Sequence, residues 1–118
     1  MMEMMSAVPA LSALAHEGRL SIFRMLVRAG ADGMAAGDIA RANGVLPNTL
    51  SSNLNILSAA GLVQSRRAGR SIIYVAGYDR MNQLLAFLVE DCCAGTSAIC
   101  ASIALVATRC CQLEAQAC

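Results

Sequence analysis

Apolar residues recur at the spacing of an α-helix in several separate stretches of this chain. In each stretch they form one stripe that a protein core could bury, while polar residues occupy the rest of each turn. The stripe residues that we expect to face inward in the first half of the chain are Ile22, Phe23, Leu26, Leu50, Leu54 and Leu57. Helices are predicted at roughly 6–15, 18–29, 36–42, 47–60, from 79 onward with Asp79 as N-cap, and 97–116.

The middle of the chain combines two helices, a tight turn and a hairpin. Asn43-Gly44 separates the third and fourth predicted helices, and glycine supplies the positive φ that a sharp turn needs. Pro47 suits the first turn of the following helix. Two short strands follow at 62–66 and 71–75. We therefore predict a mainly α fold with a small β-hairpin (α+β), a winged helix-turn-helix of five or six helices plus a two-stranded wing.

Polar residues of the helix at 47–60 fall largely off its apolar stripe. They are short, neutral hydrogen-bonding side chains, which suit base edges and phosphates in a major groove, although an ordinary solvated helix face has the same composition. The hairpin favours DNA, because three guanidinium groups around a glycine turn are suited to phosphate. The residues predicted to contact DNA are Asn48, Thr49, Ser51, Ser52, Asn55, Arg66, Arg67 and Arg70.

These motifs together resemble the ArsR/SmtB family of bacterial repressors over about 11–75. ALAHEGRLSIFRML is similar to that family's "LAH…RL.IL..L" helix, and GDIARANGVLPNTLSSNLNILSAAGLVQSRRAGRSIIY to its "LS…S.HL..L..AGLV" segment and "R.GR…Y" wing. The resemblance implies a winged helix-turn-helix that dimerises through its terminal helices and binds operator DNA. This chain departs from the family at Glu17-Gly18, where Pro-Thr is common, and at Ser52-Asn53, where His-His is frequent. The operator preference is therefore not carried over.

Charge and length fit a small dimeric DNA-binding protein. The chain has 118 residues, enough for one domain, with a DNA-binding core at 6–77 and a dimerisation and sensor region at 78–118. It contains no lysine, and nine arginines against eight acids give a net charge of +1. The positive charge must therefore be concentrated on the wing. A two-fold dimer would double it and place two recognition helices roughly 34–36 Å apart.

The sequence suggests a cytoplasmic protein without a membrane partner. MMEMMSAVPA has an acid and no basic segment, unlike a signal peptide, and the longest apolar run, in AICASIALVA, is about half of the ~20 residues that a membrane helix needs. In a reducing compartment the six cysteines are better interpreted as ligands or sensors than as a disulfide framework.

A cluster of thiols lies in EDCCAGTSAIC, at Cys92, Cys93 and Cys100. Thiolates select soft, thiophilic ions, and trivalent arsenic binds three sulfurs as a pyramid. One unbroken helix would separate Cys93 from Cys100 by about 10.5 Å along its axis. We therefore expect the chain to fold back near Gly95. Buried cysteines without any function are the alternative. The resemblance favours ligation, because some arsenic-responsive members carry a Cys-Cys pair at the end of the dimerisation helix and a third Cys shortly after it.

Two further observations concern the other candidate ligands. Cys110, Cys111 and Cys118 repeat the pattern of a pair and a third cysteine, so a second three-sulfur site is an alternative to terminal disorder. His16 is the only histidine, and a zinc sensor of the related type would need several histidines and carboxylates. The resemblance places His16 in the family's LAH motif, which implies a structural or helix-end role for it rather than ligation.

The leading hypothesis is an arsenite-responsive repressor that binds palindromic operator DNA as a homodimer and releases it when trivalent arsenic binds Cys92, Cys93 and Cys100. The same fold could instead sense antimonite, methylarsenite, a soft divalent metal or thiol oxidation. A thiol enzyme or a metal-storage protein is a different class. Against an enzyme, the sequence has no second histidine, no CxxC and no glycine-rich phosphate loop, and no organic cofactor is expected.

Overall fold

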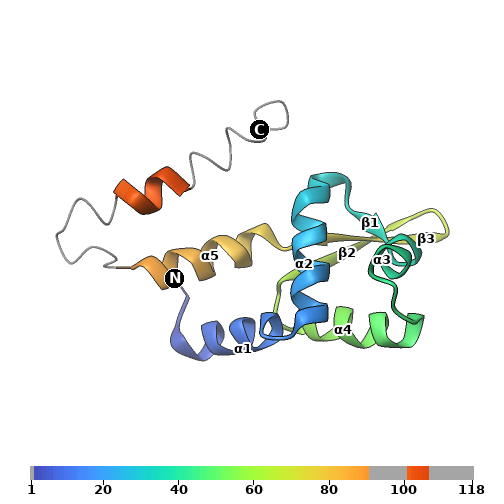
Figure 1. Cartoon of the computed structure of the whole chain (residues 1–118), viewed down its shortest axis with the longest axis horizontal. Coiled ribbons are helices and arrows are strands. Elements are labelled where there is room, and N and C mark those ends of the chain that lie inside the picture. Colours follow the sequence, from blue (N-terminus) through green and yellow to red (C-terminus); the bar gives the residue numbers. More distant parts are fainter. Residues whose placement is uncertain (1, 91–100, 107–118) are drawn as a thin grey trace. The chain divides into compact units, whose positions relative to one another are not determined.

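The structure, a computed structural model, describes residues 2–90 and 101–106 of the chain. It divides into two units, Met1–Phe87 and Leu88–Cys118, which are considered separately. In the second unit, residues 101–106 are helical. The other elements, labelled in Figure 1, are α1 (Met4–Leu14), α2 (Glu17–Ala29), the 3₁₀ helix η1 (Gly30–Asp32), β1 (Met34–Ala35), α3 (Ala36–Asn43), α4 (Pro47–Ala59), β2 (Val63–Ala68), β3 (Ser71–Ala76) and α5 (Tyr78–Val89).

Three helix ends in the first half of the chain form where the sequence predicts them. The imidazole of His16 caps α2, since its Nδ1 accepts a hydrogen bond from the backbone N–H of Arg19 at 3.3 Å. This confirms the helix-end role expected for the only histidine. Gly44 follows α3 in the left-handed conformation, with φ of 65°, as the tight turn requires. Pro47 is the first residue of α4.

The wing is confirmed, and the sheet has one more strand than the two-stranded prediction. Its three antiparallel strands lie in the order β1-β3-β2. β2 pairs with β3 from Val63 opposite Ala76 to Ala68 opposite Ser71. The extra strand, β1, has two residues, and it pairs Met34 with Tyr74. A strand this short shows no alternation of apolar and polar residues, so only its pairing reveals it.

A single apolar core holds α1 to α4, the sheet and the start of α5 together. All six residues predicted to face inward on α2 and α4 are buried in it. Leu84 continues this core on α5. The prediction that Asp79 caps α5 is wrong, because the helix begins one residue earlier and Asp79 lies in its first turn. The hydroxyl of Tyr78 donates to the carbonyl of Val27 at 3.1 Å, which fastens the start of α5 to α2.

Gly33 packs against the backbone of β3 and tolerates no side chain. Its φ is +66°, and a Cβ built there would lie 2.4 Å from the carbonyl oxygen of Tyr74. Gly30 has a similar backbone conformation, with φ of 68° and ψ of −151° against −165° at Gly33. A Cβ on Gly30 would meet nothing within 4 Å. The two glycines therefore differ in the space around them and share a backbone conformation that would strain any residue with a Cβ.

Gly33→Ala is expected to lower the free energy of unfolding by about 2–4 kcal/mol, the sum of backbone strain and overpacking. Gly30→Ala, the matched control, carries only the strain and should cost about 1–2 kcal/mol. Urea denaturation of both variants measures the difference. Equal losses would show that the contact with β3 is not tight.

Several predictions fall outside the described residues. They include all six cysteines, the fold-back near Gly95, and most of the helix predicted at 97–116, of which only 101–106 is described. The assignment of the whole chain to one domain likewise stays a prediction.

Candidate nucleic-acid interface

Helix α4 presents one apolar and one polar face. Leu50, Leu54 and Leu57 anchor it in the core and fix its rotation about its own axis. The residues predicted to contact DNA are exposed on the remaining surface, and they are Asn48, Thr49, Ser51, Ser52 and Asn55. A rigid helix with short donors and acceptors along its exposed side has the form that enters a major groove.

The wing carries two unpaired arginines close to its tip. Arg67 is the second-last paired residue of β2, opposite Ile72, and Arg70 lies in the turn between the strands. Both side chains are exposed. Within the described ranges, neither guanidinium group forms a hydrogen bond or an ion pair. Two free cations at the end of a hairpin are placed to neutralise phosphates.

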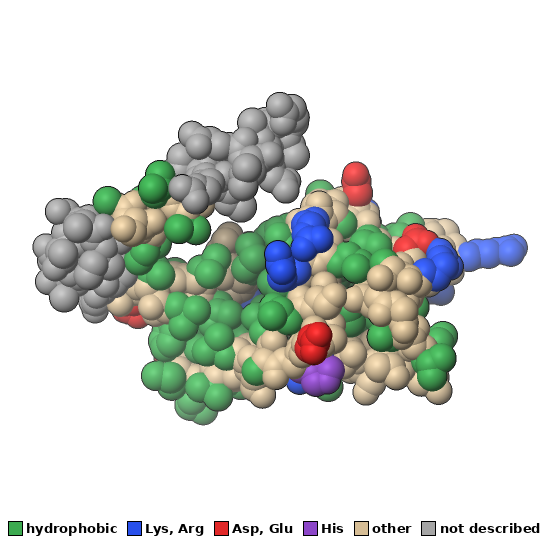
Figure 2. Space-filling model, viewed as in Figure 1, with side chains coloured by type: hydrophobic (Ala, Val, Ile, Leu, Met, Phe, Trp, Pro, Cys, Tyr) green, Lys and Arg blue, Asp and Glu red, His purple; other side chains and the backbone are tan. Residues whose placement is uncertain are grey.

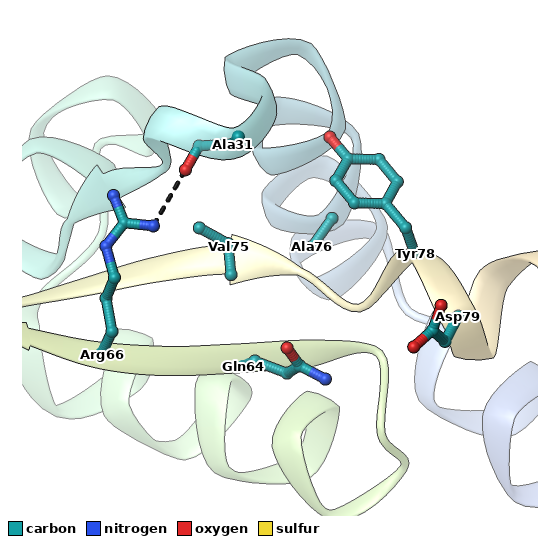
Figure 3. A pocket seen from close by; sticks show the side chains of 7 residues that line it. All are labelled: Ala31, Gln64, Arg66, Val75, Ala76, Tyr78 and Asp79. Atoms are coloured by element: carbon teal, nitrogen blue, oxygen red, sulfur yellow. Dashed lines mark hydrogen bonds between the residues drawn. The ribbon is translucent and has the colours of Figure 1, made fainter.

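Arg66 differs from the other two wing arginines, because the structure gives its side chain partners. Its guanidinium donates hydrogen bonds to the carbonyl oxygens of Ala31 at 2.9 Å and Asp32 at 3.1 Å. Figure 3 shows the side chain reaching from β2 across to η1, beside a pocket of about 310 Å³ that also borders Gln64 and Asp79. Arg66 thus fastens the wing to the turn after α2. Its contact with DNA stays a prediction.

Asn53 is a polar residue on α4 that is not among the predicted DNA contacts. Only 7% of Asn53 is exposed, whereas the predicted DNA contacts on the same helix are exposed. Its position three residues after Leu50 and four before Leu57 was a usable signal, because that spacing places it on the buried face.

Other chemistry is limited in the described part of the chain. An ion pair joins Arg41 and Asp38 on the surface of α3, where solvent screening leaves it little effect on stability. Within 2–90 and 101–106, no three histidines, cysteines or acids come together as a metal site would need. The predicted thiol ligands lie outside those ranges. Of the helices described, none combines the length and apolar character needed to cross a membrane.

Comparison with known proteins gives a consistent result. Residues 14–66 match a helix-turn-helix domain family. The chain is 31% identical over 87 residues to the HTH-type transcriptional regulator YgaV of Escherichia coli (strain K12), a match that covers 74% of this chain and 86% of YgaV.

Two solved structures share both fold and sequence with this chain. One is the homodimeric winged helix-turn-helix DNA-binding domain (fragment 1–100) of a possible ArsR-family transcriptional regulator from Mycobacterium bovis. It is 31% identical, with a TM-score of 0.59, over 73% of this chain and 80% of that one. The other is an ArsR-like transcriptional regulator from Rhodococcus sp. RHA1. It is 29% identical, with a TM-score of 0.65, over 86% of this chain and 92% of that one.

The polar face of α4, the basic wing and these relatives agree. This chain is a DNA-binding transcriptional regulator of the ArsR-type winged helix-turn-helix family.

Proposed function

We propose that this regulator is an arsenite-responsive repressor that binds operator DNA as a homodimer and releases it when trivalent arsenic binds Cys92, Cys93 and Cys100. The observation that carries the DNA half is the exposed polar face of α4 together with the free guanidinium groups of Arg67 and Arg70. The sensing half rests on the chemistry of the donor set and on the resemblance to arsenic-responsive members of the family.

Exposed apolar side chains on α1 and α5 support a dimer. Figure 2 shows hydrophobic side chains gathered over these two helices. The large ones within the first unit are Met4, Met5, Val8, Leu11 and Leu85, which are between 39% and 84% exposed. A contiguous apolar surface of this kind marks an interface on a small protein. The relative from Mycobacterium bovis is homodimeric.

Introducing a charge into this surface should separate the subunits. Val8→Glu combined with Leu85→Glu is expected to give a monomer in sedimentation velocity and to lower operator affinity at least about 10-fold, because a monomer engages one half-site. Leu20→Glu is the control, since Leu20 is 42% exposed on α2, apart from that surface. A double variant that sediments as a dimer would place the interface elsewhere.

Arsenite can be captured by three thiols without any redox change. Arsenous acid, As(OH)₃, exchanges its three hydroxyl groups for three cysteine sulfurs, so three S–As bonds form and three waters leave. Soft sulfur ligands bind soft, thiophilic ions such as trivalent arsenic in preference to hard ions. Release of DNA then requires only that the arsenic-bound protein has lower DNA affinity, which is a coupling free energy between two sites.

A transcriptional reporter downstream of the protein's own promoter tests this function in cells. Expression should be low in the presence of the regulator and should rise on adding arsenite. If expression rises with antimonite, methylarsenite or cadmium instead, the inducer is that ion and the proposed thiol site is retained. If expression responds only to oxidants, the cysteines sense by thiol oxidation rather than by binding an ion. Expression that is higher with the regulator than without it would contradict repression.

A further inference from the structure

A pocket of about 430 Å³ lies where the start of α2 meets α4 and the turn after α3. Its polar lining comes from His16, Glu17, Ser21, Asn43 and Asn53, with the backbone of Gly18 between them. None of these groups belongs to the exposed face of α4 or to the wing.

Hydrogen-bond donors without acceptors converge on this pocket. The Nδ1 atom of His16 accepts from Arg19, so the donor of the neutral imidazole is Nε2. In the described part of the chain, the backbone N–H groups of Glu17 and Gly18 have no acceptor. They belong to the first turn of a 13-residue helix, whose N-terminal end carries partial positive charge.

The amide of Asn53 completes this set of donors. Asn53 as a whole residue is 93% buried, and among described residues its side chain has no hydrogen-bond partner. Neighbouring polar groups are already engaged, because Ser21 Oγ donates to Asn43 Oδ1 at 2.8 Å and Asn43 Nδ2 donates to the carbonyl of Ile39 at 2.9 Å. Among the described residues, no side-chain nitrogen or oxygen that is closed off from solvent lacks a partner, so the amide of Asn53 opens into the pocket, where a ligand or solvent can bind it.

Gly18 brings the backbone of α2 close to these side chains. A Cβ at this position would lie 3.2 Å from His16 Cε1 and 3.4 Å from Asn53 Nδ2. The missing side chain therefore leaves the pocket open between the imidazole and the amide. Glu17, at the rim, is exposed and can turn its carboxylate into solvent.

We propose that this pocket binds a phosphate group, held by the first-turn N–H groups of α2, His16 Nε2 and the amide of Asn53. Backbone amides at a helix N-terminus are a general phosphate-binding device. Thr49 lies one turn before Asn53 on α4 and is exposed, so the pocket borders the face assigned to DNA. Insofar as the phosphate comes from DNA, the inference rests on the proposed DNA-binding role. Free phosphate offers the same oxygens.

Two substitutions close the pocket without removing a cation. Asn53→Leu replaces the unpaired amide by an apolar side chain, and Gly18→Ala places a methyl group between imidazole and amide. Each is expected to lower the affinity for a non-specific duplex about 10-fold at every salt concentration. The salt slope should stay unchanged, because neutral donors displace no counterions.

Stability separates this role from a structural one. The Tm of Asn53→Leu should equal or exceed that of the wild type, because an apolar side chain replaces an amide on a mostly buried residue. The Tm of Gly18→Ala should change little, because the gain in helix propensity offsets the tight 3.2 Å contact of the new methyl group with His16 Cε1. Gly37→Ala is the matched control, since Gly37 is also the second residue of a helix and its Cβ would make only an ordinary 3.5 Å contact with Arg41. Its DNA affinity should be that of the wild type. Unchanged affinity in both pocket variants overturns the proposal.

Nuclear magnetic resonance of ¹⁵N-labelled protein distinguishes the sources of phosphate. The Gly18 amide and the Asn53 side-chain amide should shift on adding a non-specific duplex. If inorganic phosphate added without DNA also shifts them, the site binds the free ion as well. If only the duplex shifts them, the ligand is the phosphate backbone of DNA. Shifts at Thr49 without shifts at Gly18 and Asn53 overturn the inference and leave DNA binding intact. A duplex that shifts neither the pocket residues nor α4 contradicts both the pocket inference and the proposed DNA binding. If inorganic phosphate also causes no shift, the pocket does not bind the free ion either.

Discussion

Replacing Arg67 and Arg70 together by glutamine is expected to lower DNA affinity at least about 100-fold at 0.1 M salt. The physical reason is counterion release, since each guanidinium that neutralises a phosphate contributes about 0.9 to the slope of log affinity against log salt. The proposed dimer would lose four such groups, so the slope should fall by about 3.6. Fluorescence anisotropy over a series of salt concentrations measures both quantities.

Arg24 and Arg28 provide a control with the same change in charge. Both are exposed on α2, away from the wing. The double replacement Arg24→Gln, Arg28→Gln should change affinity less than about 3-fold, because only long-range attraction is lost and salt screens it. If the two double variants weaken binding equally, net charge is responsible and the wing has no direct contact with phosphate.

Alanine at Cys92, Cys93 or Cys100 is expected to abolish arsenite-induced release while DNA affinity stays within about 2-fold of the wild type. Removing one of three sulfurs leaves an incomplete donor set for trivalent arsenic, whereas DNA affinity depends on α4 and the wing. Anisotropy of the preformed complex, titrated with arsenite in the presence of reductant, measures this loss of response.

The second group of cysteines tests whether the response belongs to one site. A variant with Cys110, Cys111 and Cys118 all changed to alanine should respond to arsenite like the wild type. If it loses the response while Cys92→Ala keeps it, the sensing site lies in the last residues of the chain.

Local chemistry made most of the fold predictable. The Asn43-Gly44 turn, Pro47 at the start of α4 and the leucine stripe of that helix each specify structure within one or two turns of chain. All were confirmed. His16 was also assigned to a helix end, where it caps α2. These features depend on neighbours in sequence, which a pattern can register.

Features that depend on distant partners escaped the sequence. β1 exists only because Met34 and Ala35 pair with β3, some forty residues later. Arg66 looked equivalent to Arg67 in sequence, yet its guanidinium is engaged by carbonyls of η1. Which arginine of a hairpin faces back to the domain depends on strand register and twist.

Asn53 shows the same limit within the site. Its spacing on α4 indicates the buried face, but the pocket it lines is formed by residues of α2 and of the turn after α3. The thiol site is different in kind, because its prediction rests on spacing and soft-ligand chemistry over residues that the structure does not describe.

A single titration shows whether arsenite releases the protein from DNA. A labelled duplex from the protein's own promoter region is first saturated with protein in reductant, and arsenite is then added while anisotropy is followed. We expect tight binding and a fall of anisotropy to the value of free DNA, complete near one arsenite per three-cysteine site. Anisotropy that stays at the bound value with excess arsenite would contradict arsenite sensing and leave a winged-helix regulator with another signal.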